Sequence, residues 1–271
     1  MSSNRVGERF VKRYQDLGTC ARAAANYRWL AEVSSPLKLP DLLAVHDRHL
    51  DFAFLPGVAA QPADLLPIAS HLGDVHGAIH NAVLYRAHLG TAYDPGDGHR
   101  ISGFLDQRLS AIQRRLALKM VPGPGLDLTA ARDHMFAALS GPVALYKDSN
   151  PRNFLIGGDG LPVTVDFDDL TLAPFGYDLA KLIVALAMTH GRIPTVLIGR
   201  ALDAYNAAAW LHDHNLGQVT GEQLLTWAEI HHILTSPYLG RGGYKHSWHQ
   251  LRPTLGELRT QPSDDGGTPW L

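Results

Sequence analysis

The stretch from Leu145 to Asp169 constrains the fold of this chain most, because short apolar segments alternate there with polar loops in a fixed order. Residues 143–145, 154–156 and 163–167 are apolar runs of a length that predicts short strands. Between the second and third runs, Gly157-Gly-Asp-Gly160 is typical of a tight turn. The stretch therefore predicts a small β insert that reads strand, loop, strand, turn, strand.

Three oxygen-bearing side chains stand at defined places in this insert. Asp148 and Asn153 lie on the first loop, and Asp166 lies at the end of the third run. Phosphoryl transfer from ATP needs a carboxylate that orients the acceptor hydroxyl and oxygen ligands that hold Mg²⁺ against the phosphates. These three residues could supply both. The alternative is that Asp148 and Asn153 form turns and Asp166 caps a strand.

The rest of the chain changes character at Pro56-Gly57. Before this point the pattern is strand, helix, strand, strand, and after it helical spacing of apolar residues dominates. We expect a small N-lobe at residues 1–57, a helical C-lobe at 58–260 and a flexible tail at 261–271.

The spacing of apolar residues predicts the elements of both lobes. Thr19 is expected to cap the first helix, and the Gly/Asp/Pro-rich residues 93–98 are expected to form a loop. Strands are predicted at 9–14, 42–46 and 50–55, and helices at 19–33, 64–84, 101–118, 129–139, 177–189, 194–210 and 221–234.

The charge balance and the cysteine count exclude several classes of protein. Lys plus Arg number 24 and Asp plus Glu number 26, so no concentrated positive field is expected for nucleic acid or an anionic membrane. The longest apolar stretch, Leu179 to Met188, is short and contains Lys181, so we interpret it as a buried helix. The single cysteine, Cys20, allows no internal disulfide, and the N-terminus has no apolar signal core. We expect a cytoplasmic protein, although a cysteine-poor secreted protein would have the same cysteine count.

The polar loop and the strand after it resemble the aminoglycoside phosphotransferase and choline kinase-like family. Those proteins typically show His-Gly-Asp, four residues, then Asn, and later an apolar run that ends in Asp. This chain has Tyr146-Lys147-Asp148, four residues, Asn153, and then Val165-Asp-Phe-Asp168. Gly176-Tyr-Asp-Leu-Ala180 resembles the segment that follows the metal-binding Asp of the family, and the resemblance covers roughly residues 9 to 190.

The resemblance implies an α+β, two-lobed protein kinase-like fold, with a small and partly truncated β-containing N-lobe and a larger, mainly helical C-lobe. It implies ATP and Mg²⁺ as cofactors and a hydroxylated small molecule as the substrate. Carried over to this sequence, Asp148 would be the catalytic base, and Asn153 and Asp166 would bind Mg²⁺. Lys12 would contact the ATP phosphates, and Asp178 would support the catalytic loop.

The N-lobe departs from the family pattern. Only eleven residues precede Lys12, and at ~3.3 Å per residue they form one strand and not the hairpin that covers the phosphates. Gly7 is the only glycine among them. The helix residue that pairs with the lysine is Glu in the family, but Ala23 stands near that position, and Glu32 lies nine residues farther on.

The catalytic loop departs from the pattern as well. Tyr146-Lys147 replaces His-Gly, and Lys147 adds a cation beside Asp148 that favours the ionised carboxylate. We predict that Lys147 joins in binding the nucleotide, with an anionic acceptor as another partner. For Asp168 and Asp169 we weigh surface or capping roles at least as highly as a share in metal binding.

Two other groups of polar residues have simpler interpretations. His76 and His80 stand at a spacing that zinc sites use, but no third ligand is evident, so we interpret them as core or surface histidines. The basic face at Arg108, Arg114, Arg115 and Lys119 is interpreted as solvated; the alternative is recruitment of phosphate or of an anionic substrate.

The departures leave two other functions open. Because the phosphate-covering hairpin is missing, the chain could be a pseudokinase-like binding protein without catalysis. It could also be a peptide Ser/Thr kinase in which a partner protein completes the N-lobe.

Overall fold

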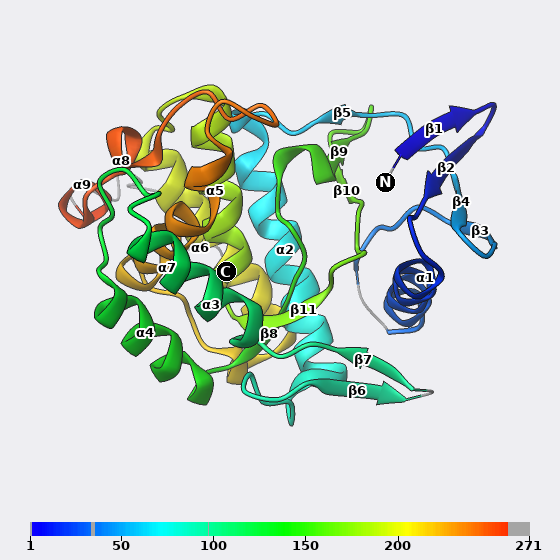
Figure 1. The fold of residues 1–271 in the computed structure, drawn as a ribbon, viewed down its shortest axis with the longest axis horizontal. Helices are drawn as coiled ribbons and strands as arrows, with labels where there is room; N and C mark the ends of the chain where they lie inside the picture. Colours follow the sequence, from blue (N-terminus) through cyan, green and yellow to red (C-terminus); the bar gives the residue numbers. More distant parts are fainter. Residues whose placement is uncertain (1, 34–35, 97, 260–271) are drawn as a thin grey trace, which may run out of the picture.

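The chain forms two unequal lobes in a computed structural model that describes residues 2–33, 36–96 and 98–259. In Figure 1 a small sheet with one helix lies on one side of the molecule, and the helices of the larger lobe lie on the other. The predicted α+β, two-lobed architecture is confirmed. The predicted tail at 261–271 lies outside the described residues.

The N-lobe is a four-stranded antiparallel sheet in the order β1-β2-β4-β3, with one helix packed against it. A turn at Gly7, whose φ is +60°, connects β1 to the strand of Lys12, so one strand precedes that lysine. The order in the N-lobe is therefore strand, strand, helix, strand, strand, and the predicted order of strand, helix, strand, strand is wrong. Asp16 caps the helix by accepting from the backbone N–H of Thr19, so the prediction of Thr19 as the cap is wrong. The elements are β1 (Ser2–Val6), β2 (Arg9–Arg13), α1 (Leu17–Glu32), β3 (Leu42–Val45) and β4 (His49–Ala53).

The C-lobe consists of helices around a small β insert. Its helices are α2 (Leu65–Ile79), which continues as a π-helix over His80–Leu84, α3 (Asp106–Ala117), α4 (Leu128–Ala137), α5 (Tyr177–His190), α6 (Thr195–His212), α7 (Gly221–Thr235), α8 (Trp248–Leu251) and α9 (Leu255–Arg259). Its strands are β5 (Val58–Ala59), β6 (Tyr93–Gly96), β7 (His99–Ile101), β8 (Val143–Tyr146), β9 (Phe154–Ile156), β10 (Pro162–Thr164) and β11 (Thr171–Pro174).

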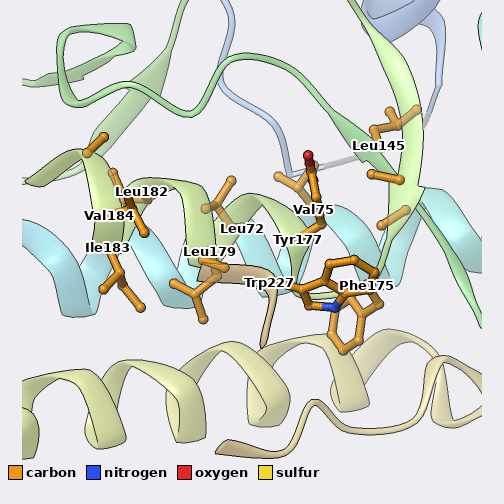
Figure 2. Packing of buried hydrophobic residues seen from close by; sticks show 14 of the residues in the cluster. Leu72, Val75, Leu145, Phe175, Tyr177, Leu179, Leu182, Ile183, Val184 and Trp227 are labelled. Carbon is orange, nitrogen blue, oxygen red and sulfur yellow. The ribbon is translucent and has the colours of Figure 1, made fainter. Parts of the chain in front are cut away.

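Helix α5 forms the centre of this lobe. Every residue from Tyr177 to Met188 is buried, including Lys181, which confirms the prediction of a buried helix. Figure 2 shows side chains of α5 packed among residues of α2 and α7. No helix in the described ranges is long and apolar enough to cross a membrane.

Helices α2 and α6 approach each other closely because α2 presents glycines to its neighbour. A Cβ atom on Gly77 would lie 2.5 Å from the backbone oxygen of Ala209, and one on Gly73 would collide with the carbonyl of Tyr205. These contacts fix the position of α2, whose other face lies beneath the β insert.

Three sequence predictions need correction. Residues 93–98 were expected to form a loop, but β6 and β7 pair there as a hairpin, so the next helix starts at Asp106 and not at 101. The third strand of the insert covers 162–164 and not 163–167. The chain leaves this strand before Asp166, whose φ of +70° turns the backbone out of the sheet.

Candidate active site

The loop between β8 and β9 positions Asp148 and Asn153. The side-chain amide of Asn153 donates to the backbone oxygen of Asp148 at 2.7 Å, and the backbone N–H of Asn153 donates to the carbonyl of Asn150 at 2.8 Å. Asn153 is buried, whereas the side chain of Asp148 is 51% exposed. The loop therefore holds a fixed amide beside a carboxylate that solvent or a ligand can reach.

Asp166 lies just after β10, close to the loop between β8 and β9. The backbone N–H of Val165 donates to the carbonyl of Asn153 at 2.9 Å, which ties the residue before Asp166 to the catalytic loop. The backbone N–H of Asp166 donates to the hydroxyl of Tyr27 on α1 at 3.0 Å. The structure thus brings together the segments of Asp148, Asn153 and Asp166.

Lys147 lies between the segment of Asn153 and the segment of Asp166. Its ammonium group is buried and donates to the backbone carbonyls of Asn153 at 3.0 Å and Val165 at 2.6 Å. It lies over the rings of Phe154 and Phe167, and burial lowers the pKa of Lys147 to about 7. A contact of Lys147 with the nucleotide stays a prediction, and the observed contacts give this residue the role of joining the two segments.

Lys12 enters the site from β2 of the N-lobe. Its Nζ lies 2.6 Å from Oδ1 of Asp166 and 2.8 Å from Oδ2 of Asp168. Asp168 is buried and also accepts a hydrogen bond from the hydroxyl of Tyr14 at 3.0 Å. Burial raises the pKa of Asp168, while the charge of Lys12 acts in the opposite direction. Of the roles weighed for Asp168, a surface role is wrong because the residue is buried, and a share in metal binding stays a prediction.

Over its described residues 17–32, helix α1 has no glutamate that could pair with Lys12, but its Asn26 binds the segment that carries Asp168. Ala23 is buried, and one turn farther on Asn26 donates to the backbone carbonyls of Phe167 at 2.7 Å and Asp168 at 3.1 Å. The carboxylate that pairs with Lys12 therefore comes from the segment after Asp166, and α1 holds that segment. Sequence reasoning missed Asn26, and it did not predict the contact of Asp168 with Lys12, although the Asp-x-Asp spacing of Asp166 and Asp168 was visible.

Asp178 is buried in the core of the C-lobe, and its support of the loop between β8 and β9 stays a prediction. Its carboxylate lies 2.6 Å from Nε2 of His76 and accepts from the hydroxyl of Tyr205 at 2.9 Å. His80 pairs in the same way with Asp213 at 2.6 Å. His76 and His80 are both buried, which confirms their interpretation as core histidines.

The donor set fits a hard divalent cation. Asn153 uses its amide nitrogen for the bond to Asp148, which leaves its Oδ1 as the available ligand atom. Asp166 pairs with Lys12 through Oδ1 and has a second carboxylate oxygen. Oxygen ligands of this kind suit Mg²⁺.

A cavity of about 380 Å³ opens beside Asp148, among α3, α5, α7 and residues 238–244. Lys181 lies 3.4 Å from Oδ1 of Asp148 and donates to the hydroxyl of Tyr244 at 2.9 Å. Burial alone would lower the pKa of Lys181, but Asp148 and Tyr244 outweigh it and the pKa is raised. A larger groove of about 510 Å³ between α1 and β3 is lined by none of Asp148, Asn153 and Asp166. The smaller cavity is lined by Asp148 but not by Asn153 or Asp166, so it borders the site on the side of Asp148.

The two lobes, the loop and the lysine–carboxylate contact define a protein kinase-like phosphotransferase fold. The sequence matches the phosphotransferase enzyme family over residues 2–214. The chain belongs to this family. A comparison with curated proteins found no match.

Solved structures share the fold at low identity. An aminoglycoside phosphotransferase from Streptomyces rimosus, in complex with ADP and streptomycin, is 13% identical with a TM-score of 0.54, over 86% of this chain and 88% of its own. A choline/ethanolamine kinase family protein from Mesorhizobium loti is 16% identical with a TM-score of 0.55, over 86% and 74%. Amicoumacin kinase, in complex with AMP-PNP and Ca²⁺, is 13% identical with a TM-score of 0.56, over 97% and 83%.

Proposed function

We propose that this protein transfers the γ-phosphoryl group of ATP to a hydroxyl group of a small molecule in a Mg²⁺-dependent reaction. The observation that carries the proposal is the set of hydrogen bonds that ties the segments of Asp148, Asn153 and Asp166 together, with Lys12 at 2.6 Å from Asp166. Membership of the phosphotransferase family and fold relatives solved with ADP or AMP-PNP support it. The use of ATP and the single free cysteine, Cys20, favour the cytoplasm.

Each residue of the site has a distinct role in this proposal. Asn153 and Asp166 would hold Mg²⁺, which neutralises phosphate charge when it is bound. Lys12 would bind phosphate oxygens, and Asp168 keeps its ammonium group in position. Asp148 would accept the proton of the acceptor hydroxyl, and Lys181, at 3.4 Å from its Oδ1, would help to hold the carboxylate in place.

The test is turnover of ATP with a panel of hydroxylated metabolites and antibiotics. Because a positioned base contributes about 10²- to 10⁴-fold, Asp148→Asn should lower kcat by that factor. Asp133→Asn is the control, since this carboxylate is exposed on α4. Equal rates in wild type and Asp148→Asn would remove Asp148 from the mechanism.

A second candidate function is binding without catalysis. It is favoured by the short N-lobe, where one strand and the turn at Gly7 stand before Lys12. Calorimetric titration with Mg-ATP separates the two functions. Micromolar binding that Lys12→Met weakens, together with turnover of an acceptor, supports the kinase. The same binding without turnover of any acceptor, or no binding at all, supports the second function.

A further inference from the structure

The cavity beside Asp148 is unusually rich in cations. Among the described side chains that line it, five are cationic and one is a carboxylate, that of Asp148 itself. His231 adds no charge near neutral pH, because burial and then the charge of Lys181 hold its pKa well below its usual range. The cationic residues are Arg108, Arg115, Arg152, Lys181 and Arg241.

These cations converge from separate parts of the C-lobe. Arg108 and Arg115 stand seven residues apart on one side of α3, and Arg152 belongs to the catalytic loop. The interpretation of the α3 basic face as solvated holds for Arg114, which is exposed, but it is wrong for Arg108 and Arg115, which are partly buried and line the cavity. Charged residues that serve only to keep a protein soluble need not line the same cavity, as these cationic side chains do.

The arginines on α3 are held in place without a counter-ion. Arg108 donates to the carbonyl of Phe104 at 2.8 Å and to the hydroxyl of Thr171 at 2.6 Å, and its guanidinium group lies over the ring of Tyr146. Arg115 donates to the carbonyl of Leu234. No ion pair with a carboxylate forms at either arginine among the side chains that the structure describes.

A fixed guanidinium group with free donors is suited to a planar or tetrahedral anion, which it binds with paired hydrogen bonds. A partly buried cation without a counter-ion lowers the stability of the folded protein, and an anion removes that cost when it binds. The ATP phosphates are not this anion, because neither Lys12, Asn153 nor Asp166 lines the cavity. A polycationic acceptor would meet five positive charges against one negative charge.

We propose that the acceptor is a small hydroxylated molecule that carries a phosphate or carboxylate group, which Arg108, Arg115, Arg152 and Arg241 bind while its hydroxyl lies at Asp148. This inference rests on the proposed kinase function for the role of Asp148. A volume of about 380 Å³ is suited to a metabolite-sized ligand. The fold alone does not fix the acceptor, so likeness to aminoglycoside kinases does not decide this point.

The test measures binding without ATP, on the full chain and at constant ionic strength. The probes are inorganic phosphate, glucose 6-phosphate, gluconate, glucose and streptomycin, followed by calorimetry and by the melting temperature. We expect at least one of the anionic probes to bind at least tenfold more tightly than glucose. The sugar phosphate and the sugar acid distinguish a phosphate site from a carboxylate site.

Variants of the arginines complete the test. Arg115→Gln and, because it is exposed and tolerates change, Arg152→Gln should each weaken anion binding at least tenfold, whereas Arg114→Gln should not. The proposal is overturned if no anion binds better than glucose, if streptomycin binds best, or if Arg115→Gln and Arg152→Gln both bind like wild type.

The outcomes separate this inference from the proposed function. Asp148→Asn should keep anion binding and lose turnover. Anion binding without turnover of any acceptor would contradict the kinase function alone. Turnover restricted to neutral or cationic alcohols would contradict the anionic acceptor alone.

Discussion

The cations on the two sides of Asp148 differ in whether they pair with carboxylates. On the N-lobe side, Lys12 is buried between the carboxylates of Asp166 and Asp168, at 2.6 and 2.8 Å. On the C-lobe side, Arg108 and Arg115 make contacts with carbonyls, a hydroxyl and aromatic rings, and with no carboxylate among the described side chains.

In the proposed kinase, Lys12 is already in its final position before the nucleotide binds, whereas Arg108 and Arg115 would form their ion pairs only when an anionic ligand binds. A paired lysine keeps its geometry before the nucleotide arrives, which avoids reorganisation during the reaction. An unpaired arginine leaves its strongest hydrogen bonds to be made with an incoming anion. The absence of carboxylates beside Arg108 and Arg115 in the described part of the chain is therefore our reason for proposing that the acceptor binds in this cavity, because the fold alone does not indicate where or what the acceptor is.

The largest expected effect comes from breaking the pair on the N-lobe side. Asp168→Asn should lower the free energy of unfolding by up to about 3 kcal/mol, because it removes one of the two carboxylates that pair with the buried Lys12 and weakens the hydrogen bond from Tyr14. Chemical denaturation measures the loss. The control is Asp169→Asn, since the side chain of Asp169 is 87% exposed. Similar stability of the two variants would show that Asp168 is not the partner that Lys12 depends on.

The same variant sharpens the comparison between the two sides. Asp168→Asn should raise KM for ATP and leave the binding of inorganic phosphate to the arginine cavity within twofold of wild type. A parallel loss of both would mean that the two sides do not act independently.

Acid should weaken the protein through imidazoles of the C-lobe that stay neutral in the folded state. Burial lowers the pKa of His71 to about 4, and burial also lowers the pKa of His134 and His231. Unfolded imidazoles bind protons below about pH 6.5, whereas the folded ones do not, so the free energy of unfolding should fall as the pH drops from 6.5 to 4. His71 alone should contribute about 1–3 kcal/mol to this loss.

Denaturation curves between pH 4 and 8 measure this slope. His71→Gln should show a shallower slope than wild type, whereas His88→Gln should not. A loss of stability on going from pH 6.5 to 8 instead would contradict the direction of these shifts.

The smallest effect concerns the packing of α2 against α6 in the C-lobe. Gly77→Ala should cost about 1–3 kcal/mol, because its Cβ would lie 2.5 Å from the carbonyl of Ala209. Gly199→Ala, within α6, has nothing within 4 Å and should be neutral or stabilising by up to about 1 kcal/mol. Thermal unfolding compares the two, and equal melting temperatures would contradict the close contact of α2 with α6.

The sequence predicted those parts of the fold and the site that depend on local pattern. Asp148, Asn153 and Asp166 were visible because the turn chemistry of the insert fixes their spacing. Asp168 was not, because its burial depends on Lys12 and Tyr14, which are more than 150 residues away and meet it only in the folded chain. The β6–β7 hairpin was missed because Gly, Asp and Pro favour turns, while the contact of His99 with Asn26 at 2.7 Å is tertiary.

The contact of Lys12 also connects the two halves of the molecule. Here β2 carries the ammonium group, and both carboxylates belong to the chain that follows β10. Any motion that separates β2 from the chain after β10 would therefore break this ion pair, so the charge around Asp166 and Asp168 would change with the distance between the lobes.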